Sequence, residues 1–222
     1  MKKIKRNLFW IVVTTLMTLI PLFFGVIMWN KLPDTMATHF NFRGEADGYS
    51  SKVFAVVGLN LILMIVHVVV ALITAVDPKN EDDAISDKIY CLILLFIPVV
   101  SVFCGVLTYS NAIGIAINIP LITQLFIGLL FLVLGNYMPK MHRNYTVGIR
   151  LPWTMDDTEN WDHTNRFAGR LFMVCGLIMI MNAFLNVGGE KGFVFILIGC
   201  AVLEAVIPTI YSYIYYMMHG QK

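Results

Sequence analysis

Charged residues are scarce in this chain of 222 residues, where Asp, Glu, Lys and Arg together make up 14% of the sequence. Soluble globular proteins carry about 25% charged and about 45–50% apolar residues, whereas 58% of this chain is hydrophobic. A soluble fold with so few charges would expose large apolar patches and aggregate. The scarcity therefore excludes a soluble domain and indicates an integral membrane protein.

Cysteines and catalytic motifs are also lacking. The four cysteines lie inside apolar runs, and no two of them form a C-x-x-C pair, which argues against a disulfide framework or a metal cluster. The sequence contains no H-E-x-x-H, G-x-S-x-G or paired acidic motif. We therefore expect a protein that is not an enzyme and that has no metal and no cofactor.

Six long apolar runs predict an all-α protein of six transmembrane helices, since a hydrocarbon core of ~30 Å needs ~20 apolar residues in helical form. Four runs contain no Asp, Glu, Lys or Arg, the fifth contains only Arg170, and the sixth only Glu204. A transmembrane barrel would instead show alternating segments of ~10 residues. We expect a single polytopic membrane domain over residues 1–222. The runs are Leu8–Trp29, Val53–Val76, Ile89–Tyr109, Ala112–Leu134, Phe167–Val187 and Gly192–Tyr216.

The basic residues are distributed unequally between alternate connections. With the N-terminus inside, the inner segments hold twelve Lys and Arg residues and the outer segments hold four, Lys31, Arg43, Lys52 and Lys191. Because cytoplasmic loops are enriched in Lys and Arg, this bias predicts a multi-pass protein of the cell membrane with both termini cytoplasmic. The net charge of +2 reflects this asymmetry, and we expect no direct nucleic-acid binding.

The longest outer connection, residues 31–52, combines turn-forming residues with aromatic ones. Pro33, Gly44 and the Asp47-Gly48 pair favour turns, and three aromatic residues are interleaved with them. This pattern predicts a compact, structured extracellular loop. The one histidine in it, His39, has no suitably spaced second ligand, so a metal site is not expected.

The longest inner connection, residues 137–165, is basic in its first half. A capping-box-like start at Thr154 predicts an amphipathic helix that continues through Trp161 into the fifth span. Arg166 and Arg170 would then share one face of that helix. We predict a structured cytoplasmic loop.

A positive-inside anchor accounts for the charges of this loop but not for the segment NYTVGIRLPWT. There a strand-like apolar run is crossed by Gly148, Arg150 and Pro152. The segment is interpreted as one that either folds against the helix ends or meets a partner.

Two ionisable residues at membrane depth, His67 and Glu204, are the remaining candidates. Ionisable groups in hydrocarbon are costly and usually face a cavity or one another. One interpretation is a titratable pair, and the other is that Glu204 packs as a neutral acid between helices. No internal repeat with matching broken helices is present, which weakens a transporter interpretation.

Both long connections resemble the SdpI-type membrane immunity and signal-transduction family, together with the small outer-loop domain often found with it. The outer match is carried by Pro33, His39, Phe40, Asn41, Gly44, Asp47, Gly48 and Lys52. The inner match, which is the more specific, is carried by Gly135, Asn136, Pro139, Asn144, Gly148, Ile149, Arg150, Pro152, Trp153, Thr154, Trp161, Thr164, Asn165, Phe167, Gly169 and Gly176.

The resemblance implies a bacterial immunity protein that resists a secreted, membrane-active peptide toxin and also sequesters a cytoplasmic transcriptional repressor. The expected partners are therefore the toxin, the repressor and the lipid bilayer. The alternative is a proton-coupled exporter that uses Glu204 and His67. Candidate residues of the cytoplasmic partner loop are Asn144, Gly148, Arg150, Pro152, Trp153, Thr154, Trp161, Asn165 and Arg166, and those of the extracellular loop are His39, Asn41, Gly44 and Asp47.

Overall fold

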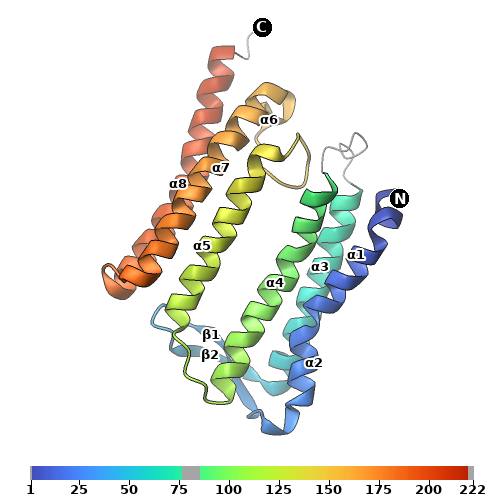
Figure 1. Cartoon of the computed structure of the whole chain (residues 1–222), viewed down its shortest axis with the longest axis vertical. Coiled ribbons are helices and arrows are strands. Elements are labelled where there is room, and N and C mark those ends of the chain that lie inside the picture. The colour runs from blue at the N-terminus through green and yellow to red at the C-terminus, as the bar shows by residue number, and fades with distance from the viewer. Residues whose placement is uncertain (1, 77–85, 220–222) are drawn as a thin grey trace. The chain divides into compact units, whose positions relative to one another are not determined.

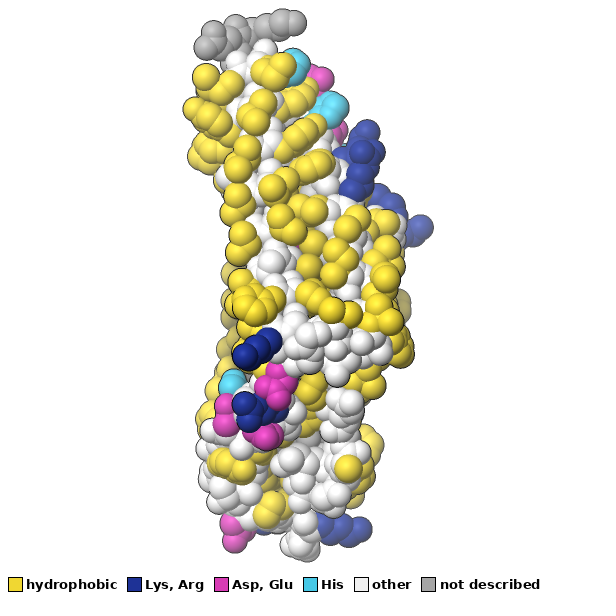
Figure 2. All heavy atoms as spheres, turned by 90° about the vertical axis from the view of Figure 1, so that its left-hand side faces the viewer, with side chains coloured by type: hydrophobic (Ala, Val, Ile, Leu, Met, Phe, Trp, Pro, Cys, Tyr) yellow, Lys and Arg dark blue, Asp and Glu magenta, His cyan; other side chains and the backbone are white. Residues whose placement is uncertain are grey.

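A computed structural model describes residues 2–76 and 86–219. Two of the twelve basic residues that were expected on the inner side, Lys79 and Lys222, lie outside the described residues. Six helices in the described part of the chain are long and apolar enough to cross a membrane, so the prediction of a multi-pass membrane protein is confirmed. Hydrophobic side chains cover long stretches of the face in Figure 2, and the acidic and basic side chains gather in groups.

The chain divides into two compact units, shown in Figure 1, and each is described by itself. Unit 1 holds residues 2–76 and 87–119, and unit 2 holds residue 86 and residues 120–219. That residues 1–222 act as a single membrane domain stays a prediction.

Unit 1 contains three apolar spans and a hairpin. The first span is divided into two helices at Leu19, just before Pro21, whose ring removes a backbone donor. In order, the elements are α1 (Lys2–Thr18), α2 (Ile20–Ile27), the 3-10 turn η1 (Trp29–Lys31), β1 (Thr35–Phe40), β2 (Ala46–Ser51), the π-helical turn η2 (Phe54–Gly58), α3 (Leu59–Ala75) and α4 (Asp87–Ala112).

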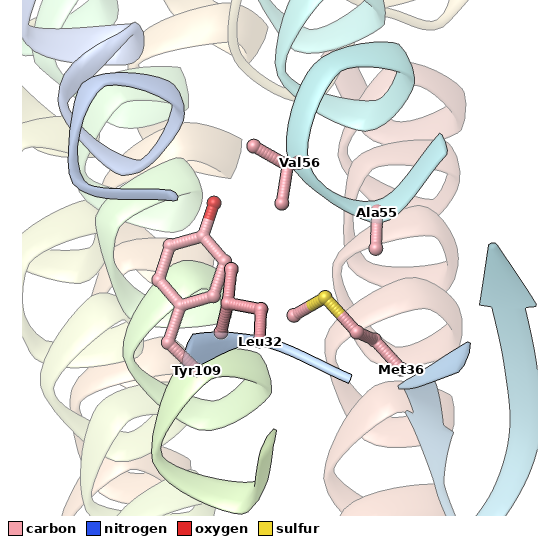
Figure 3. Close-up of a cluster of buried hydrophobic side chains, with 5 residues drawn as sticks. All are labelled: Leu32, Met36, Ala55, Val56 and Tyr109. Atoms are coloured by element: carbon pink, nitrogen blue, oxygen red, sulfur yellow. The ribbon is translucent and has the colours of Figure 1, made fainter. Parts of the chain in front are cut away.

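The hairpin of β1 and β2 packs on the helix ends of unit 1. The strands are antiparallel, with Thr35 opposite Ser51 and Phe40 opposite Ala46. Met36 on β1 is buried and points into a small apolar cluster, which fixes the inner face of the hairpin against the helices. The cluster consists of Leu32, Met36, Ala55, Val56 and Tyr109 (Figure 3).

Unit 2 contains the other three spans, which lie side by side in Figure 1. Between α5 and α7, two glycine pairs let the backbones approach closely. A Cβ added to Gly135 would lie 2.5 Å from the carbonyl oxygen of Gly169, and one added to Gly176 would lie 2.7 Å from that of Gly128. Small residues at such contacts are typical of helix packing in membranes. The elements are α5 (Ile119–Tyr137), the 3-10 turn η4 (Met138–Lys140), α6 (Pro152–Asp156), α7 (Thr158–Leu185) and α8 (Gly189–His219).

Two predicted helix boundaries are wrong. The fourth span was expected from Ala112, but α4 ends there and α5 begins at Ile119, because Gly114 has a positive φ of 75° and Pro120 favours a helix start. The helix expected to run from Thr154 into the fifth span is interrupted at Asp157. That residue is extended, with φ −118° and ψ 117°, and its carboxylate accepts a hydrogen bond from the backbone of Glu159.

Candidate functional site

The turn of the hairpin in unit 1 is organised by Asn41. Its Oδ1 accepts hydrogen bonds from the backbone nitrogens of Arg43 (2.9 Å) and Glu45 (3.0 Å), and its Nδ2 donates to the Glu45 carboxylate (3.0 Å). Gly44 has φ 79°, a conformation that glycine adopts without strain. Asn41 and Gly44 therefore shape the turn.

The exposed face of the hairpin carries a close polar pair. His39 Nδ1 lies 2.5 Å from Asp47 Oδ1, across the two strands. Opposite His39 stands Gly48, where an added Cβ would lie 2.8 Å from the His39 Cβ. Of the outer candidates, His39 and Asp47 thus lie together in contact with solvent, where a ligand can reach them.

The hairpin is attached to the preceding helix by Lys52. The ammonium group donates to the carbonyl oxygen of Leu32 (2.8 Å), pairs with Asp34 (3.1 Å) and lies over the ring of Trp29 at 5.4 Å. These contacts close the loop at its base, so the hairpin is held at both ends.

The inner loop of unit 2 is built around buried amides. Asn144 is fully buried, and its Oδ1 accepts from the backbone nitrogens of Thr146 and Val147, both at 2.8 Å. Asn165 on α7 accepts from the backbone nitrogen of Ile149 at 2.8 Å. Gly148 between them has φ 109°, and a Cβ there would lie 2.8 Å from Asn165 Oδ1. Only glycine fits this approach.

Trp161 and Thr154 complete the interior of the loop. The indole nitrogen of Trp161 donates to the carbonyl oxygen of Met141 (2.8 Å), and the side chain is fully buried. Thr154 Oγ1 accepts from the backbone nitrogen of Leu151 (2.8 Å) and donates to the carbonyl oxygen of Ile149 (2.9 Å). The loop is therefore a folded cap on α7, in which most of the candidate residues are internal.

Trp153 connects this cap to α8. Its Nε1 donates to Ser212 Oγ at 2.7 Å, and its ring stacks on Tyr216 and meets Tyr213 edge-on. Ser212 in turn donates to Asn160 Oδ1 at 2.9 Å, and Asn160 Nδ2 donates back to the carbonyl oxygen of Ser212 at 3.1 Å. Pro152 occupies the first position of α6, directly before the tryptophan.

The cap exposes both basic and acidic side chains, the acidic ones being Asp156, Glu159 and Asp162. The guanidinium of Arg150 is exposed and donates to the carbonyl oxygen of Tyr145. Arg166 and Arg170 are both exposed and stand four residues apart on α7. A partner approaching the cap would meet these charged groups, because the amide and tryptophan groups described above are turned inward.

The two ionisable residues at membrane depth have separate surroundings. His67 on α3 is buried in unit 1, where its Nε2 lies 3.1 Å from Thr14 Oγ1 of α1. Glu204 on α8 is buried in unit 2, within hydrogen-bonding reach of the Cys175 thiol on α7. Its Oε1 has no hydrogen-bond partner among the described residues. A titrating pair of His67 and Glu204 stays a prediction.

Comparisons with known proteins cover both the hairpin and the cap. The profile of the SdpI/YfhL protein family matches residues 140–212, and that of a domain of unknown function, DUF1648, matches residues 16–64. The chain is 29% identical over 213 residues to the immunity protein SdpI of Bacillus subtilis (strain 168), and the alignment covers 96% of each chain. The resemblance to the SdpI family is confirmed. No solved structure matches the chain.

Sequence reasoning missed three residues that build this site. Ser212 accepts the hydrogen bond of Trp153 and is itself bonded to Asn160, 52 residues earlier in the sequence. Cys175 contacts Glu204 from another helix. The available signal was their polarity or small size within apolar helices, which marks helix–helix contacts in membranes. That signal does not name the partner.

Proposed function

We propose that this protein protects its cell against a secreted, membrane-active peptide toxin. The observation that carries the proposal is the alignment with an immunity protein over 96% of each chain. Both the hairpin and the cap lie within the matched regions. The proposal therefore concerns the whole chain rather than one shared segment.

We infer that the hairpin faces outward and that both termini are cytoplasmic. The inference is supported by the even number of candidate spans among the described residues, which would bring both ends to one side, and by the basic residues, which favour the cytoplasm for that side. With this orientation, the exposed His39–Asp47 pair lies on the side from which a secreted toxin approaches.

The cap is proposed as the binding site for a cytoplasmic repressor. Its interior is occupied by its own hydrogen bonds, so recognition falls to exposed side chains, among which we propose the cations Arg150, Arg166 and Arg170 as the partner-binding groups. Arginine is the cation best suited to bidentate contacts with carboxylates on a partner protein. We infer a binding protein rather than an enzyme.

Proton-coupled export is retained as the alternative because of one observation. A carboxyl group buried at membrane depth, with one oxygen lacking a partner among the described residues, is the kind of group that proton pathways use. This alternative requires Glu204 to change protonation, whereas toxin binding does not.

The test is expression of this protein in a toxin-sensitive host, with survival in the presence of toxin as the readout. A host that carries the empty expression vector is the control. Protection at a matched protein level supports the proposal. Death of cells that carry normal amounts of inserted protein contradicts it.

A further inference from the structure

The first apolar span of unit 1 contains a break in its helix. α1 ends at Thr18 and α2 begins at Ile20, with Leu19 between them, and we call residues 18–21 the bend. Pro21 cannot donate a backbone hydrogen bond to the preceding turn. The bend lies inside a candidate membrane span, where unpaired backbone groups are costly. Its carbonyl oxygens therefore need donors from a neighbouring helix.

Helix α4 supplies these donors from one of its faces. Ser101 Oγ donates to the carbonyl oxygen of Thr18 at 2.8 Å, and the Tyr109 hydroxyl donates to that of Pro21 at 2.7 Å. Gly105 lies midway between the two donors, and a Cβ added there would lie 2.6 Å from the Pro21 Cβ. Residues spaced by four share a helix face, so the bend is seated closely along one face of α4.

Tyr109 also belongs to the apolar cluster beneath the hairpin. Its ring is packed in this cluster with Leu32 and with Met36, which comes from strand β1 (Figure 3). One side chain thus lies among the residues that seat the hairpin while its hydroxyl binds the bend. Ser101, the other donor, lies outside the cluster.

The packing around the Tyr109 hydroxyl leaves little room for movement. A Cβ added to Gly25 on α2 would lie 2.6 Å from the Tyr109 hydroxyl oxygen and 2.5 Å from Val56 Cγ1. A hydrogen bond of 2.7 Å is lost beyond about 3.5 Å. A shift of the ring by about 1 Å therefore either breaks its bond to Pro21 or moves α2 with it, because closely packed interiors transmit small displacements.

The bend converts such a shift into a larger movement at the far end of α1. The 17 residues of α1 extend about 26 Å from the bend, at about 1.5 Å per residue. A change of about 5° in the angle at the bend then moves the far end of a helix of this length by about 2 Å. That end and the hairpin lie at opposite ends of the first span, since the hairpin follows α2 in the chain.

We propose that Tyr109 couples the seating of the hairpin to the bend, so that a ligand that displaces the hairpin shifts α1 at the other end of the span. The coupling runs from Met36 through the cluster to the Tyr109 ring, and from its hydroxyl to Pro21. Ser101 holds the bend without taking part in the cluster, so it does not sense the hairpin. The coupling does not depend on which ligand binds or on immunity to a toxin.

Hydrogen exchange of the purified full chain in detergent, read by mass spectrometry, tests the proposal. The backbone amides of Leu19 and Phe23 report on the bend, since each donates a 3.1 Å hydrogen bond there. Fragments over residues 35–51 report on the hairpin. Exchange at such sites measures local opening rather than the stability of the whole protein.

Two single variants first separate the bend from the hairpin. Tyr109→Phe keeps the ring in the cluster but removes the hydroxyl, and it is expected to speed exchange at the bend by about threefold to tenfold, the loss expected for one hydrogen bond. Ser101→Ala is the matched control, because it removes the other donor to the bend and should have a similar effect there. Neither variant should change exchange in the hairpin.

Met36→Ala then decides whether the two sites are coupled. In the parent chain and beside Ser101→Ala, it is expected to speed exchange both in the hairpin and at the bend. Beside Tyr109→Phe, it should speed exchange in the hairpin alone. Met36→Val is the milder variant if the Ala protein does not fold, and fragments of α7 in unit 2 should exchange at the parent rate throughout, which excludes global unfolding. An unchanged bend in the Met36 variant, or the same increase at the bend in all three backgrounds, overturns the proposal.

Discussion

The indole nitrogen of Trp153 donates a 2.7 Å hydrogen bond to the hydroxyl of Ser212, 59 residues further along the chain. This bond fixes the short helix α6 to α8, and Asn160 holds the same hydroxyl from α7. Three helices of unit 2 thus meet at one serine. The tryptophan therefore has a structural role in unit 2, and its part in recognition by a partner stays a prediction.

We predict that Trp153→Ala lowers the stability of the protein by about 2 kcal/mol, since it removes a half-buried ring and a hydrogen bond. Trp153→Phe keeps an aromatic ring against Tyr213 and Tyr216 and should cost only about 1 kcal/mol. Thermal unfolding in detergent and the amount of protein in membranes measure both. Full stability of the Ala variant would show that the contact with α8 contributes nothing.

Arg150→Ala is expected to leave stability unchanged and to weaken binding of a partner. The guanidinium is exposed, so the variant should insert normally and unfold at the parent temperature. If Arg150 docks a cytoplasmic repressor, the fraction of repressor that sediments with membranes should fall several-fold, because hot-spot truncations cost on the order of 2 kcal/mol. Arg150→Lys keeps the charge without the bidentate geometry and is the matched control. Unchanged sedimentation in the Ala variant rules out docking through this residue.

The glycine contacts between α5 and α7 give a third prediction. Gly169→Ala should destabilise the protein by about 1–3 kcal/mol, because the added Cβ would lie 2.6 Å from the carbonyl oxygen of Gly135 and force the helices apart. Gly199→Ala on α8 is the control, since no atom lies within 4 Å of its added Cβ. That change should leave stability the same or raise it by up to about 1 kcal/mol. Equal unfolding temperatures for the two variants would contradict the close packing.

Much of the fold could be predicted from the positions of the charges alone. The six spans follow from the apolar runs, because bilayer thickness sets a minimum length that is independent of tertiary detail. The interruption of the helix at Asp157 could not be predicted, because Thr154 is as suitable an N-cap residue as Asp157. The structure uses Thr154 inside the cap instead, where its hydroxyl bonds to Leu151 and Ile149.

The candidate site was less predictable than the fold. The motif identified Trp153 and Asn165, but it did not separate buried residues from exposed ones. Asn165 supports the backbone of Ile149 from within, whereas Arg150 faces outward. A motif in one sequence records which residue types occur together, and their burial depends on contacts with helices that are distant in the chain.

The orientation is tested by labelling with a membrane-impermeant maleimide after Cys104, which is exposed, has been replaced by Ala. A cysteine at Asp47 should react in intact cells, whereas one at Asp156 should react only after permeabilisation. Asp156 is preferred to Asp157 because Asp157 caps α7 through its carboxylate. Labelling at Asp156 alone in intact cells would reverse the proposed orientation.

Glu204→Gln separates the two proposed functions. Gln has nearly the shape of a protonated Glu and can still meet the Cys175 thiol, so a structural acid should tolerate the change. We expect normal membrane insertion and normal survival in toxin, because no second acidic residue lies within the six apolar runs to complete a relay. Glu190→Gln, an exposed position in the first turn of the same helix, controls for the loss of one negative charge. A Glu204→Gln protein that inserts at the parent level but no longer protects, beside a fully protective Glu190→Gln protein, would favour proton-coupled export over toxin binding.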